Sequence, residues 1–141
     1  METMNPNQKI VPVFNLLRLT YGLVPIVAGL DKFTNILTNW EQYLNPTVAS
    51  FLPFSAATFM MIVGVIEIVA GLIVLARPTI GGYIVMAWLA LIALTLIASG
   101  KYFDVAVRDL VMAIGAYSFV QIAKVALAWR TEPARHQVAF R

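Results

Sequence analysis

The sequence predicts an all-α integral membrane protein, in which four transmembrane helices pack as an antiparallel bundle in one domain, residues 1–141. Of these residues 60% are hydrophobic and 12% are charged, and the mean hydropathy is +0.81. A typical soluble domain is about half apolar and about one-quarter charged. Seven acidic and ten basic residues are too few to cover a soluble domain of this length. Four apolar stretches also each contain the roughly 20 residues that a membrane-spanning helix needs.

The four spans are expected at about residues 10–30, 51–76, 80–99 and 105–129. The third span contains no charged residue, which argues against a soluble helical bundle. In the long connection after the first span, apolar residues recur at helical spacing, and Trp40 and Tyr43 suit the headgroup level. We therefore expect a short interfacial helix over residues 33–44, ended by Asn45 and Pro46, with an irregular polar loop as the alternative.

Basic residues outside the spans predict the orientation. The side without the termini carries only Lys32 and Lys101, each close to acidic residues. The side that holds both termini carries Lys9, Arg77, Arg130, Arg135 and Arg141. Because connections rich in Lys and Arg stay in the cytoplasm, both termini are expected inside. The basic tail over residues 130–141 is expected to fray or to lie on anionic headgroups.

The counts of cysteine and histidine exclude several classes of site. Without cysteine there is no thiol chemistry, iron–sulfur cluster or zinc–thiolate site. One histidine, His136, excludes a His-rich metal site and a haem held by two histidines. The net charge is only +3 and the bases are scattered, so nucleic acid is not an expected partner. We expect no intrinsic cofactor and no metal.

Ionisable residues within the spans are the candidate functional residues. A charge at the bilayer centre costs about 3 kcal/mol unless it is paired or faces protein or water. Arg18 lies roughly 4–5 Å to the cytoplasmic side of the middle of the first span, and Glu67 lies roughly 5–6 Å toward the same side in the second. This match in depth predicts an Arg18–Glu67 ion pair inside the bundle. The alternative is that Arg18 extends alone to the cytoplasmic headgroups.

A second layer of charge is expected at the outer boundary of the membrane. Asp31 and Lys32 end the first span, and Arg108 and Asp109 lie near the start of the fourth. Pairing of Lys32 with Asp109, and of Arg108 with Asp31, would join the first and fourth spans at this rim. Separate solvated charges are an equally good interpretation, because exposed ion pairs contribute little.

Small residues share a helix face with these charges. The first span carries Arg18, Gly22, Pro25, Gly29 and Lys32 at steps of four, three, four and three residues. The second carries Met60, Gly64, Glu67, Gly71 and Val74 at the same steps. Glycines let membrane helices approach closely, so both faces are expected to line the bundle interior. Pro25 is expected to bend the first span and to widen a cavity above the Arg18 layer.

Several of these runs resemble the DoxX/DoxD-like family of membrane proteins. The similar stretches are residues 18–22 and 29–33, Trp40 with residues 43–44, residues 64–72, and residues 102–110 with Gly115 after them. The resemblance implies a four-span protein of the bacterial inner membrane, and members have been linked to quinone-coupled sulfur oxidation and to oxidative-stress complexes at the membrane. It also implies candidate site residues at Arg18, Lys32, Glu67, Arg108 and Asp109.

Three functions are consistent with these observations. The first is an accessory or partner subunit of a redox-linked, quinone-associated membrane complex, without catalysis of its own, which binds quinone or lipid beside Glu67 and Arg18. The second is a structural or assembly subunit whose ion pair fixes helix register and whose third span, with Trp88, contacts another subunit. The third is a small transporter. A single buried carboxylate gives little support for a transport pathway through the bundle. The expected partners are the lipid bilayer and other membrane-protein subunits, including further copies of this chain.

Overall fold

The computed structural model describes residues 5–131, and within that range every regular element is a helix. In chain order these are α1 (Pro6–Asp31), the 3-10 helix η1 (Trp40–Tyr43), α2 (Pro46–Phe51), α3 (Ala56–Ala76), α4 (Pro78–Ser99) and α5 (Phe103–Thr131). The helices α1, α3, α4 and α5 are each long and apolar enough to cross a membrane. The predicted all-α, four-span architecture is therefore confirmed, whereas nearly all of the predicted tail over residues 130–141 lies outside the described residues.

Local capping residues fix where the spans begin and end. The Ser55 hydroxyl accepts a hydrogen bond from the Thr58 N–H at 3.2 Å, so the second span begins at Ala56 rather than near residue 51. Only Arg77 separates α3 from α4, because Pro78 occupies the first turn of α4, where its missing N–H is not needed. α4 ends at Ser99 and is capped by Gly100, whose φ of +71° lies in the left-handed region that favours glycine.

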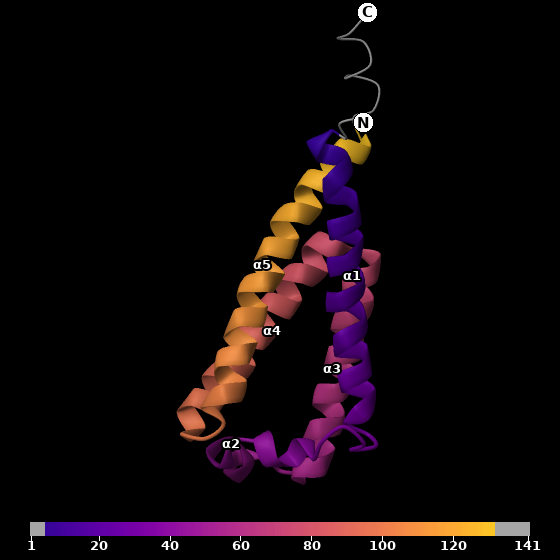
Figure 1. Ribbon diagram of the computed structural model, residues 1–141. Coiled ribbons are helices and arrows are strands. Elements are labelled where there is room, and N and C mark those ends of the chain that lie inside the picture. Colours follow the sequence, from indigo (N-terminus) through magenta and orange to yellow (C-terminus); the bar gives the residue numbers. More distant parts are fainter. Residues whose placement is uncertain (1–4, 132–141) are drawn as a thin grey trace, which may run out of the picture.

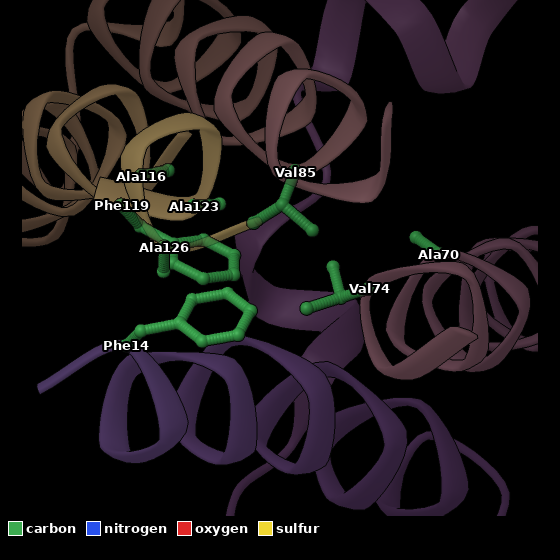
Figure 2. Close-up of a cluster of buried hydrophobic side chains, with 8 residues drawn as sticks. All are labelled: Phe14, Ala70, Val74, Val85, Ala116, Phe119, Ala123 and Ala126. Carbon is green, nitrogen blue, oxygen red and sulfur yellow. The ribbon is translucent and has the colours of Figure 1, made fainter. Parts of the chain in front are cut away.

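The four long helices form two closely packed pairs, α1 with α3 and α4 with α5. Figure 1 shows the pairs converging at the end of the bundle where α1 begins and α5 ends, and separated at the opposite end, where α2 lies. A core cluster joins the pairs toward the converging end (Figure 2), and it consists of Phe14, Ala70, Val74, Val85, Ala116, Phe119, Ala123 and Ala126. Within it the rings of Phe14 and Phe119 stack with 6.1 Å between their centroids.

Glycines set the close contact between α1 and α3. A Cβ atom built on Gly29 would lie 2.5 Å from the carbonyl oxygen of Gly64, and one built on Gly64 would lie 2.6 Å from the carbonyl oxygen of Gly29. Seven residues away on each helix, a Cβ atom on Gly71 would collide with the carbonyl oxygen of Gly22. The two glycine-bearing faces therefore meet as the sequence predicts, in an antiparallel register that sets Gly22 opposite Gly71 and Gly29 opposite Gly64.

The connection between α1 and α3 differs from the prediction. Over residues 33–44 the helix is replaced by a turn and the four-residue η1, which makes the irregular alternative the better description. Asp31 is the cause, because its carboxylate accepts hydrogen bonds from the backbone N–H groups of Ile36 and Leu37 at 2.9 and 3.1 Å. These bonds hold the backbone out of the helical pattern. Asn35 completes the turn with a φ of +51°.

The short helix of this connection is α2, which begins where the predicted helix was expected to end. Pro46 is its first residue, and the Asn45 side chain caps it by accepting a hydrogen bond from the Thr47 N–H at 2.9 Å. The Asn45 Nδ2 also donates to the carbonyl oxygen of Thr95 in α4 at 3.1 Å. The connection is thereby attached to α4 at the end where the helix pairs separate.

Large apolar side chains cover the outside of the bundle. Leu16, Val111 and Ile114 are 65%, 62% and 67% exposed, and many other large apolar residues of the four long helices are also exposed. Soluble proteins rarely expose contiguous apolar surface on this scale, whereas lipid tails are as apolar as these side chains. These faces contact a lipid bilayer, and the chain is a multi-pass membrane protein.

The glycine contact predicts a stability difference between two substitutions that each enlarge a helical residue. We expect Gly64→Ala to lower the free energy of unfolding by about 1–3 kcal/mol, because the added methyl group meets the Gly29 carbonyl oxygen and overpacks the helix pair. The matched control is Ala87→Val on the exposed face of α4, where a change within about 0.5 kcal/mol is expected. Reversible unfolding in mixed detergent micelles measures both, and equal effects of the two substitutions would contradict the close contact.

Candidate functional site

A cavity of about 820 Å³ lies between the two helix pairs. All four long helices and the connection contribute side chains to its wall, and most of them are apolar, among them Val24, Val63, Leu89 and Met112. Pro25, where the sequence predicts a bend beside a cavity, is one of the lining residues. The charged lining residues are Lys32, Glu67, Arg108 and Asp109. The cavity is therefore a largely apolar space with charge at a limited set of positions.

Lys32 and Glu67 form a buried ion pair in the cavity wall. The Lys32 Nζ donates to Glu67 Oε2 at 2.6 Å, and the two side chains are only 4% and 9% exposed. Lys32 follows the last residue of α1 and Glu67 lies in the middle of α3. Removing two charges from water is costly, and close pairing with good hydrogen-bond geometry is what offsets this cost.

Two tryptophans and an aspartate extend this ion pair into a cluster. The Trp88 indole N–H of α4 points to Glu67 Oε1 at 3.4 Å, and Lys32 Nζ lies 3.7 Å from the centre of the Trp40 ring, which is a cation–π contact. The Trp40 indole N–H in turn donates to Asp31 Oδ2 at 2.7 Å. This charge cluster, consisting of Asp31, Lys32, Trp40, Glu67 and Trp88, joins α1, η1, α3 and α4.

Asp109 of α5 is a further charged residue of the cavity wall, outside the charge cluster. Its residue is 8% exposed and lines the cavity together with Arg108, Glu67 and Lys32. Within residues 5–131 it forms no ion pair, because the one pair there is Lys32 with Glu67. Arg108 is exposed and also lines the cavity. Asp109 is therefore a largely buried residue whose carboxyl group is open to the cavity.

The predicted Arg18–Glu67 ion pair is wrong. Arg18 Nη2 donates instead to the carbonyl oxygen of Leu75, in the last turn of α3, where carbonyl groups have no partner within the helix. The glycine register explains this, because it sets Arg18 opposite Leu75, eight residues or roughly 12 Å along the axis from Glu67. Neither sequence alternative applies, since Arg18 is half-buried and occupied by a backbone carbonyl of the neighbouring helix.

The direction in which helical side chains lean explains why Lys32 is the partner. A helical Cα–Cβ bond tilts toward the N-terminus of its own helix. Lys32 therefore leans from the end of α1 back into the bundle, while Glu67 of the antiparallel α3 leans outward, so the two long side chains approach each other. By the same rule Arg18 leans away from Glu67, toward the start of α1.

The predicted pairs at the outer rim, Lys32 with Asp109 and Arg108 with Asp31, are also not formed. Lys32 is held by Glu67. Asp31 accepts hydrogen bonds within its own segment, from Thr34, Ile36, Leu37 and Trp40. These local donors satisfy the Asp31 carboxylate and make a partner on α5 unnecessary. The first and fourth spans are thus joined by the core cluster rather than by ion pairs at this rim.

Two site residues were not expected from the sequence. Trp40 was assigned to the headgroup level and Trp88 to a face that contacts another subunit, but both line the cavity and contact the charge cluster. A signal was available for Trp88, because a buried indole N–H needs an acceptor and Glu67 was the carboxylate expected inside the bundle. For Trp40 no comparable signal exists, since tryptophans are common at membrane interfaces.

Comparisons of this chain with protein families, with curated proteins and with solved structures find no match. Within residues 5–131, no group of three or more His, Cys, Asp or Glu side chains is placed to hold a metal ion. The site is therefore described by its own chemistry, which consists of a large apolar cavity, a neutralised ion pair with two indoles, and a carboxyl group that faces the cavity.

The identity of the Glu67 partner can be tested with double-mutant cycles. We expect Glu67→Gln to cost about 3–5 kcal/mol of stability, because it leaves the Lys32 ammonium buried without a counter-charge. Combined with Lys32→Met, the losses should be non-additive by about 0.5–3 kcal/mol, as for residues in direct contact.

The matched control is the cycle of Glu67→Gln with Arg18→Leu. Its two losses should add to within about 0.5 kcal/mol, since the residues are far apart in the register. Unfolding in mixed detergent micelles gives each value. Additivity for Lys32 together with coupling for Arg18 would restore the pairing expected from the sequence.

Proposed function

We propose that this chain binds a lipophilic molecule of quinone size in the cavity, as a DoxX-like accessory subunit of a redox-linked, quinone-associated membrane complex. The observation that carries the proposal is the cavity itself, which is large and mostly apolar and has buried charged groups in its wall. An amphiphilic ligand matches such a site, because its ring or tail replaces contacts with lipid while its polar head meets polar side chains.

The dimensions of the cavity support a ligand of this class. Ligand pockets for molecules of moderate size have volumes of about 300–1,000 Å³ and mainly apolar walls with few polar groups, and the cavity of about 820 Å³ lies within that range. Trp88 and Trp40 add aromatic surface next to the charged groups. Flat aromatic side chains beside hydrogen-bonding groups suit a flat ring that carries oxygen substituents.

An accessory role fits the chemistry of the described residues. Nearly all of residues 5–131 belong to the four long helices and the connections between them, and two of the charged groups at the cavity, Lys32 and Glu67, bind each other. Redox chemistry on a bound quinone therefore requires a partner subunit that supplies or removes electrons. We place the protein in a bacterial inner membrane with both termini in the cytoplasm, where the basic residues of that side favour them.

Ligand retention tests this proposal. Protein purified in mild detergent and extracted with organic solvent should yield quinone at a ratio well above that of the bulk membrane lipid, measured by mass spectrometry. Val63→Trp should lower the retained amount by about ten-fold, equivalent to about 1.4 kcal/mol, because the indole fills cavity space beside Glu67.

Val65→Trp is the matched control, since Val65 lies two residues further along α3 and is 52% exposed on the outer face. It should retain quinone as the unchanged protein does. Extraction of phospholipid alone at bulk ratios would overturn the binding proposal and favour the structural or assembly role, in which the charge cluster only holds the helices together.

A further inference from the structure

In the wall of the cavity, the donor groups of the charge cluster have partners within the described part of the chain, whereas one acceptor group has none there. The Lys32 ammonium is taken up by Glu67 and the Trp40 ring. The Trp88 indole N–H points to Glu67, and the Trp40 indole N–H is donated to Asp31. The buried donors of the charge cluster are thus already engaged with protein acceptors.

Asp109 is the charged residue of the cavity wall whose carboxyl group remains available to a ligand as a hydrogen-bond acceptor. No hydrogen bond or ion pair joins its carboxyl group to another of residues 5–131, although the residue is 8% exposed and lines the cavity. An ionised carboxylate only accepts hydrogen bonds, and in that state the Asp109 group calls for a donor on the ligand. The Asp109 oxygens are open to the cavity, so a ligand that covers them must supply a hydrogen-bond donor or leave the acceptor unpaired, which is costly.

The charged residues around Asp109 restrict which ligand headgroups suit the cavity. Lys32 is neutralised by Glu67, and Arg108 lines the cavity with Asp109 and balances its charge, so the wall has no net negative charge that would favour an ammonium headgroup. A hydroxyl group needs no such charge. It donates its O–H to Asp109, and its oxygen keeps lone pairs that accept from the exposed Arg108 guanidinium.

From these contacts we infer that the cavity prefers a ligand with a hydroxyl headgroup, with Asp109 as the specificity-determining acceptor, and hence a quinol over the corresponding quinone. This inference rests on the proposed function and deepens it. Quinone carbonyl oxygens only accept hydrogen bonds, so a quinone would set an acceptor against the ionised Asp109 carboxylate, which has no proton to donate, and leave it unsatisfied. The hydroquinone of the same ring presents an O–H at that position with almost the same shape.

Calorimetric titration of the full chain in lipid nanodiscs tests the preference with a matched series of ligands. The probes are duroquinone, durohydroquinone kept reduced, and the dimethyl ether of durohydroquinone, which has the same ring but no O–H. Titration of empty nanodiscs gives the partition of each probe into lipid. We expect the hydroquinone to bind about ten-fold more tightly than both the quinone and the dimethyl ether.

Asp109→Asn should reduce this preference to less than about two-fold, because the amide offers the ligand a donor as well as an acceptor. The variant should fold, since no other described residue depends on the carboxyl group, and circular dichroism checks this. Asp104→Asn, at an exposed position in the first turn of α5, is the control and should keep the preference.

The outcomes separate this inference from the proposed function. Equal binding of the three probes, tighter binding of the quinone, or a preference that survives in folded Asp109→Asn would each overturn the hydroxyl inference while leaving a quinone-sized site in place. Failure of all probes to bind would overturn the proposed function and the inference with it. The ligand series on the unchanged protein decides the preference even where the variant fails to fold.

Discussion

The buried pairing of Lys32 with Glu67 is the interaction on which the arrangement of this bundle depends. Two opposite charges in an apolar environment must stay in contact, because separating them leaves each one desolvated without compensation. That requirement fixes the end of α1 relative to the middle of α3. The indoles of Trp40 and Trp88 then bring the connection and α4 to the same point. A few polar contacts thus determine the position of elements that are otherwise held by non-directional apolar packing.

Features that depend on local sequence could be predicted well. The four spans follow from length and hydropathy, and the glycine faces of the first two spans follow from their spacing. The partner of Glu67 could not be predicted in this way. Depth estimated from span midpoints carries an error of several residues, since α3 begins at Ala56 instead of near residue 51. The lean of each side chain along its helix also separates Arg18 from Glu67 and brings Lys32 toward it.

The candidate site was predicted in part for the same physical reason. Charged residues are rare within apolar spans because they are costly there, so Lys32, Glu67 and Asp109 stood out, and the structure places all three at one cavity. Asp31 was chosen by the same rule but is engaged by the turn that follows it. Which carboxyl group satisfies its own loop and which one faces a cavity depends on donors brought near by folding, and these are not visible in the spacing of residues.

The position of the core cluster has a mechanical consequence. The stacked rings of Phe14 and Phe119 and their neighbours join the two helix pairs toward one end, while the glycine contact binds α1 rigidly to α3. If one helix pair turned against the other, the aromatic rings would lie at the pivot and the cavity would change in width. The displacement would be greatest at the far end, where the Asn45–Thr95 hydrogen bond attaches the connection to α4.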